Sequence, residues 1–316
     1  MRSRPNPGAL SSALFSAVIL AAFLAFLAFP TRYLGCVADG VSLWAACVLP
    51  AALPFLFLTG LLAKTPLFSR LSKGLAPLFS RLFGVSGAGG CAALLSVLSG
   101  YPAGAKTVER LCEQGLLARD ERLRCACLAS TSGPAFLVGV AGAAMAGDPA
   151  LGWLLFASHL AGVFGVSFLL GRKKSRRHTA PPPPSAGGLI AAVPETLTSS
   201  VLSVLTVGGA VALFYAFGCM LGDALAPLAL PQTAAAALAG LIEMTAGCSR
   251  LLASPTPLSL AVAAFLVTFG GLCVLVQQWS FLAKTGIPPA KFLLVKCLQG
   301  ALAALVCFGL ACACGV

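Results

Sequence analysis

Residues 94–111 read "LLSVLSGYPAGAKTVERL". The stretch begins as a lipid-soluble run, stops at Gly100, Tyr101 and Pro102, and ends in charged residues. Within a bilayer, non-helical backbone is tolerated only where protein or a water-filled cavity surrounds it. If the chain lies in a membrane, this break predicts a hairpin tip or a broken helix that lines a cavity.

The composition places the chain in a membrane. Of its 316 residues, 59% are hydrophobic and 9% are charged, and its mean hydropathy is +0.96. Soluble domains have only about 45–50% apolar residues. Apolar stretches of about 20 residues, the length that crosses a hydrocarbon core, recur along the chain. We therefore expect an all-α polytopic membrane protein, rather than a soluble protein with a large core or a nucleic-acid-binding protein.

Seven full spans are predicted. They cover about 10–29, 41–62, 125–147, 150–170, 197–222, 257–279 and 290–312. Between the second and third, "KTPLFSRLSKGLAPLFSRLFG" (64–84) alternates leucines and phenylalanines with basic residues at helical spacing, which predicts an amphipathic helix in the membrane interface. Two shorter apolar segments, 84–105 and 233–248, either span the membrane or enter and leave it on one side.

The positions of lysine and arginine favour the second arrangement, because cytoplasmic loops collect these residues. If both short segments span, 9 basic residues lie inside and 12 outside. If both are re-entrant hairpins, 19 lie inside, Lys296 among them, and only Arg32 and Arg250 lie outside. The N-terminus is then cytoplasmic, and the two hairpins enter from opposite faces, as in an inverted repeat.

A basic, proline-rich linker, "GRKKSRRHTAPPPPSAGG" (171–188), divides the chain. We predict an N-terminal span and external loop at 1–40, a first repeat at 41–170, a cytoplasmic linker at 171–190 and a second repeat at 191–316. The first apolar run is too long for a signal peptide and is interpreted as a retained span. A weak match sets Ala103–Gly104 against Ala246–Gly247; chance similarity between alanine- and glycine-rich segments is the alternative.

Glu243 is the only acidic residue deep in an apolar segment. An ionisable group at the bilayer centre costs about 2.5–3.5 kcal/mol or more. We expect Glu243 to serve a coupling cation such as Na⁺ or a proton path; the alternative is that its segment is shallow and the carboxylate is in water.

The first break offers Ser99, Tyr101, the backbone at Gly100 and Gly104, and Lys106. Helix N-termini favour anions, so Lys106 either completes an anion site or extends to the cytoplasmic interface. "STSGPAF" (130–136) repeats this chemistry: Thr131 and Ser132 supply hydroxyls, and Gly133–Pro134 disrupts a helix near its start. Interhelical packing is the alternative role for these hydroxyls.

The remaining polar residues suggest simpler roles. His159 is expected to be a buried neutral histidine rather than a proton relay. Gln277 and Gln278 are expected to anchor a span at the interface, and the alternative is that one of them faces the cavity. The 13 cysteines show no CxxC spacing, and with only two histidines they predict neither a zinc site nor a disulfide framework. No nucleophile, metalloprotease or phosphate-loop motif is present, so we expect no enzyme activity, cofactor or metal.

The sequence resembles the YlbJ-type sporulation integral membrane proteins, which carry paired nucleoside-recognition Gate domains. The resemblance is carried by "SGYPAGAKTVERLCEQG", "STSGPAFLVGVAG" and "IEMTAGCSRL", in that order and separated by the basic linker. The family motif falls on three groups of positions in this chain: Ser99, Gly100, Tyr101, Pro102, Gly104 and Lys106; Thr131, Ser132, Gly133 and Pro134; and Glu243, Thr245 and Gly247.

The resemblance implies a relationship to concentrative nucleoside transporters and a place in the outer forespore membrane or cell membrane of a spore-forming bacterium. It also implies dipicolinic acid as cargo. We therefore expect a secondary transporter of a small anionic metabolite, with the motif residues as its substrate site. The alternatives are a nucleoside-type transporter, a non-transporting scaffold for the spore envelope and an intramembrane enzyme. Alanine- and glycine-rich helix faces permit a homo-oligomer without setting its size.

Overall fold

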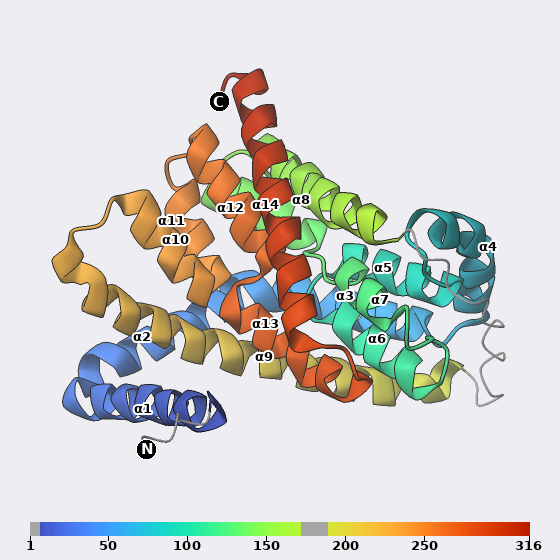
Figure 1. Ribbon diagram of the computed structural model, residues 1–316, viewed down its shortest axis with the longest axis horizontal. Coiled ribbons are helices and arrows are strands. Elements are labelled where there is room, and N and C mark those ends of the chain that lie inside the picture. The colour runs from blue at the N-terminus through green and yellow to red at the C-terminus, as the bar shows by residue number, and fades with distance from the viewer. Residues whose placement is uncertain (1–6, 172–188) are drawn as a thin grey trace, which may run out of the picture.

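The computed structural model describes residues 7–171 and 189–316, and within these ranges the chain is helical without a strand (Figure 1). The all-α membrane fold predicted from composition is therefore confirmed. The basic linker and the first six residues, which hold Arg2 and Arg4, lie outside the described residues.

The helices follow one another with short connections. In chain order they are α1 (Pro7–Ala28), α2 (Pro30–Leu43), the π-helix η1 (Trp44–Val48), α3 (Leu49–Leu62), α4 (Pro66–Leu82), α5 (Gly87–Ser99), α6 (Ala103–Glu113), α7 (Arg122–Leu128), the π-helix η2 (Ala135–Met145), α8 (Pro149–Leu170), α9 (Leu189–Leu225), the 3₁₀ turn η3 (Ala226–Leu228), α10 (Gln232–Ile242), α11 (Met244–Leu252), α12 (Pro257–Phe269), α13 (Gly271–Leu282), the 3₁₀ turn η4 (Ala283–Thr285) and α14 (Pro289–Cys314).

Five helical stretches in the described part of the chain are long and apolar enough to cross a membrane. They are Pro30–Leu62, Pro149–Leu170, Ile190–Leu228, Pro257–Thr285 and Pro289–Cys314. A sixth is obtained if α4 and α5, which meet at 95°, are counted as one bent span. The sequence-based count of seven full spans stays a prediction.

Three predicted segments differ in detail. The expected loop that holds Arg32 is helical, because α2 begins at Pro30 and continues through η1 into α3. The segment 125–147 is broken between α7 and η2, where Pro134 lacks the N–H that a continuous helix requires. The segment 257–279 is broken at Gly270 and Gly271, whose φ angles of 99° and 65° favour glycine.

Each of the two short apolar segments consists of two helices separated by a break. In the first pair, α5 and α6 pack against each other and are separated by Gly100–Pro102. In the second, α10 and α11 pack against each other and meet at Glu243, whose backbone is extended. Each pair precedes a broken helix, α7–η2 or α12–α13, and then a long helix, α8 or α14. The re-entrant path of these pairs through the membrane, and the inverted repeat, remain predictions.

Close packing of long helices joins the two halves of the chain. Helices α8, α12 and α14 contact one another, as Figure 1 shows at the upper centre. A Cβ atom at Gly162 of α8 would collide with the Gln299 carbonyl on α14, and one at Gly300 would lie 3.0 Å from the Phe265 ring on α12. Small residues thus let these helices approach closely, and the long helix α9 contacts α2, α3, α10 and α13.

Candidate functional site

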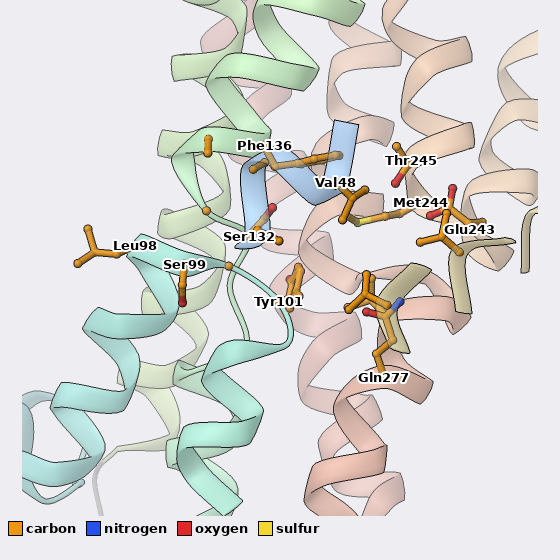
Figure 2. Close-up of a pocket in the computed structure, with 18 residues that line it drawn as sticks. Val48, Leu98, Ser99, Tyr101, Ser132, Phe136, Glu243, Met244, Thr245 and Gln277 are labelled. Carbon is orange, nitrogen blue, oxygen red and sulfur yellow. The ribbon is translucent and has the colours of Figure 1, made fainter. Parts of the chain in front are cut away.

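A cavity of about 60 Å³ lies where three helix breaks meet, beside the first turns of α13 (Figure 2). The first hairpin contributes 98–101, the broken helix α7–η2 contributes residues from 132 to 136, the second hairpin contributes 243–245, and α13 contributes Val274 and Gln277. The other walls are apolar side chains of η1, α3 and α9: Val48, Ala51, Ala52, Val207 and Val211.

The tip of the first hairpin rests directly on the first broken helix. Gly100 has a φ of 77°, and its N–H donates to the Ser96 carbonyl at 2.7 Å. A Cβ atom at Gly100 would lie 2.8 Å from the Gly133 nitrogen, so the two backbones are in contact. Gly100 and Gly133 both line the cavity. Glycine at both positions therefore allows the two breaks to meet.

Tyr101 connects this tip to the second half of the chain. Its hydroxyl donates to the carbonyls of Val267 at 3.0 Å and Thr268 at 3.2 Å, both near the C-terminal end of α12. The Lys296 ammonium of α14 donates to the same hydroxyl at 3.2 Å and to the Ser130 carbonyl at 3.0 Å. Lys296 also lies 5.2 Å from the centre of the Tyr101 ring, a cation–π geometry.

His159 joins the two broken helices from α8. Its Nε2 accepts a hydrogen bond from the Ser132 N–H at 3.0 Å, and its Nδ1 lies 2.9 Å from the Thr268 hydroxyl. Because Nε2 accepts, the ring proton is on Nδ1, which donates to Thr268; the geometry fits a neutral ring. His159 is fully buried, which supports the prediction of a buried neutral histidine.

Glu243 caps the second hairpin inside the cavity. Its side chain is 1% exposed, and its Oε2 accepts a hydrogen bond from the Ala246 N–H at 2.7 Å at the start of α11. No lysine or arginine lies within 4.0 Å of it among the described residues. The cavity therefore contains a buried carboxyl group held by a backbone donor, and the depth of its segment in the membrane stays a prediction.

The predicted site residues divide into two groups. Seven of them line the cavity: Ser99, Gly100, Tyr101, Ser132, Gly133, Glu243 and Thr245. Six do not: Pro102, Gly104, Lys106, Thr131, Pro134 and Gly247. The second group mostly supports the packing around the cavity. Thr131, for example, lies 2.8 Å from the Ser96 hydroxyl, and Gly247 packs against Gly240.

Lys106 does not line the cavity, and its expected place at the cytoplasmic interface stays a prediction. It is half-buried, and its ammonium group donates to the hydroxyls of Ser199 at 2.5 Å and Ser203 at 2.7 Å on α9. It thereby fixes α6 to the helix that follows the linker. We assign Lys106 to helix packing, because it does not line the cavity.

A substitution at Gly104 tests whether the motif residues that do not line the cavity serve helix packing. A Cβ atom there would collide with the Ala129 carbonyl and the Ser96 hydroxyl, so Gly104→Ala is expected to destabilise the protein by about 2 kcal/mol or more. Gly139 on η2 has no atom within 4 Å of an added Cβ, and Gly139→Ala is the matched control. Thermal unfolding of the purified variants checks this; equal melting temperatures for the two would contradict it.

Several polar residues near the cavity were missed or misplaced by the sequence. The charge rule places Lys296 on the cytoplasmic side, but its side chain is fully buried. Gln277 lines the cavity. The Gln278 side chain accepts a hydrogen bond from the Ser130 hydroxyl at 2.5 Å. Both glutamines are buried, so interface anchoring is wrong for them, and the alternative that one faces the cavity agrees with the position of Gln277. A signal for Lys296 was present: Lys296, Gln299 and Gly300 share one helical face.

These features define a multi-pass helical membrane protein whose helices are interrupted around a central cavity. Residues 45–149, which include the first hairpin and η2, match the family model described as Gate, nucleoside recognition. The chain is 30% identical over 304 residues to Sporulation integral membrane protein YlbJ of Bacillus subtilis (strain 168), covering 84% of this chain and 74% of that protein. The chain therefore belongs to the YlbJ-type sporulation integral membrane proteins. No solved structure matches it.

Proposed function

We propose that this protein is a secondary transporter of a small anionic metabolite in a spore-forming bacterium. Its cargo is dipicolinic acid, carried across the outer forespore membrane without chemical conversion. The observation that supports this best is the cavity itself, because three helix breaks meet there beside a buried carboxyl group. Broken helices around a site near the membrane midplane are typical of secondary transporters.

The cavity contains one feature that favours an anion, a helix N-terminus, and one that favours a cation, the carboxyl group of Glu243. The N-terminal end of η2, at Gly133, Ala135 and Phe136, lines the cavity, and helix N-termini favour anions. The N-terminal end of α11 already holds Glu243. We propose that the solute carboxylates bind at the start of η2, and that Glu243 binds Na⁺ or a proton.

Contacts between basic residues and other segments support the proposed orientation. Lys64 pairs with Glu195 at 2.6 Å, and Arg122 donates to the Thr285 carbonyl at 2.8 Å. All four segments that these two contacts join in pairs are expected on the cytoplasmic side. Arg32 and Arg250, the two basic residues expected outside, line a common cavity.

Uptake of labelled dipicolinate into proteoliposomes tests the proposal. We expect saturable uptake that depends on a proton or sodium gradient, because Glu243 would bind the coupling cation. Liposomes without protein and liposomes with heat-unfolded protein are the controls. Absence of uptake under every gradient, with folding confirmed, would reject the transporter and favour the scaffold for the spore envelope.

A nucleoside-type transporter is the second candidate. The match to a family model described as nucleoside recognition favours it, and Gln277 in the cavity offers an amide suited to a nucleobase. Competition separates the two: unlabelled nucleosides that block dipicolinate uptake would favour this candidate. Aromatic dicarboxylates that block it, with nucleosides inert, favour the anion transporter.

A further inference from the structure

A second cavity, of about 400 Å³, lies where α2, α9, α10 and α11 meet and is separate from the central cavity. Three charged residues line it: Arg32 of α2, Asp223 of α9 and Arg250 of α11. Most of the other lining residues are small or apolar, among them Ala235, Leu238 and Ala239 of α10. A mainly apolar hollow with a few charged groups is typical of sites for small organic molecules.

Of the two arginines in this cavity, Arg32 is in an ion pair and Arg250 is not, among the described residues. Arg32 and Asp223 form an ion pair, with Arg32 Nε 2.5 Å from Asp223 Oδ2, and the Tyr33 hydroxyl donates to the same carboxylate at 3.0 Å. Arg250 is exposed and has no carboxylate within 4.0 Å among the described residues. The cavity thus has a formal net charge of one positive unit, located at Arg250.

Both cavities are lined by α9 and by the segment formed by α10 and Glu243. On α9, Val207 and Val211 line the central cavity, and the residues from Gly218 to Asp223 line the second. Along α10, Ala239 lines the second cavity, and Glu243, just past the end of the helix, lines the central one. Ala239 and Glu243 are about one helical turn, or roughly 6 Å, apart along the chain. The second cavity therefore lies next to the central cavity along α9 and α10.

We infer that the second cavity is an outer vestibule in which Arg250 binds a carboxylate of the transported anion, on the side of the membrane opposite the basic linker. Arg32, held by Asp223, adds a fixed positive group at the edge. A guanidinium is well suited to a carboxylate because it offers two parallel donors. This inference rests on the proposed function, since it assigns a second binding position to the same solute.

Equilibrium binding of labelled dipicolinate to the purified full-length protein tests the vestibule. We expect two dipicolinate molecules per wild-type chain and one per chain for Arg250→Gln. The site lost in that variant should be the one weakened about fivefold or more in roughly 1 M sodium chloride, where the screening length is about 3 Å. Arg250→Lys keeps the charge and should retain both sites.

Two further variants make the result specific. Lys291→Gln removes the same charge from an exposed position at the start of α14, outside both cavities, and should retain both sites. Ala235→Phe fills the second cavity and leaves Arg250 in place, so it should also lose one site, and it serves if Arg250→Gln does not fold. Two sites in Arg250→Gln or in folded Ala235→Phe, or a wild-type chain with no site or with one site that Arg250→Gln retains, would overturn the vestibule. Two-site binding without uptake would instead reject only the transport proposal.

Discussion

Glu243→Gln is expected to abolish concentrative uptake of dipicolinate and to preserve exchange. Glutamine keeps the size of the side chain and an oxygen that accepts from the Ala246 N–H, so the cap of α11 persists while the negative charge in the cavity is lost. Without that charge the coupling cation has no partner. Accumulation against a gradient should fall at least about tenfold, equivalent to losing about 1.4 kcal/mol of interaction.

Two assays on the same proteoliposomes measure this effect: uptake driven by a proton or sodium gradient, and exchange of labelled for unlabelled dipicolinate at equal concentrations. Glu113→Gln, at an exposed position at the end of α6, is the control and should behave as wild type. If Glu243→Gln accumulates dipicolinate with unchanged pH and sodium dependence, Glu243 does not serve coupling.

Lys296→Met is expected to lower dipicolinate uptake at least about tenfold and to leave the protein folded. The Lys296 ammonium contacts the Tyr101 hydroxyl and the Ser130 carbonyl, and so ties the first hairpin and the first broken helix to α14. Methionine fills the same space without these bonds. Lys296 has no carboxylate within 4.0 Å among the described residues, so its replacement leaves no opposite charge unpaired, and the effect should be on transport.

The measurements are the initial rate of uptake and the melting temperature of the purified protein. Lys291→Met, at an exposed position on the same helix, is the matched control and should change neither. An unchanged uptake rate in Lys296→Met would show that these contacts are dispensable. A large drop in its melting temperature would assign Lys296 to the stability of the fold instead.

The sequence predicted the helix breaks best where a single local cause is sufficient. Gly100 and Pro102 interrupt the first hairpin as expected, since one residue adopts a positive φ and the other lacks an N–H. The break at Gly270 was missed, because "TFGG" lies inside a long apolar run and hydropathy alone cannot distinguish a broken span from a continuous one. Glu243 was identified because a buried acid is costly in a membrane.

The sequence was less informative about which residues reach the cavity. Gly104 and Gly247 have the same small-residue signal as Gly100, yet they serve close backbone packing. A glycine permits close approach to a ligand or to another helix alike, and only the tertiary arrangement separates the two. Lys296 was misplaced because the charge rule treats each lysine as a topology signal, whereas this one is buried two turns into α14.

The central claim is that the helix breaks around Gly133 and Glu243 form the binding site for the solute. An electron cryomicroscopy structure of the full-length protein with saturating dipicolinate tests it most directly. We predict density for the ligand in the cavity between the start of η2 and the second hairpin, with a carboxylate at the backbone of Gly133 to Phe136. An empty cavity at saturation, with wild-type folding, would contradict the account.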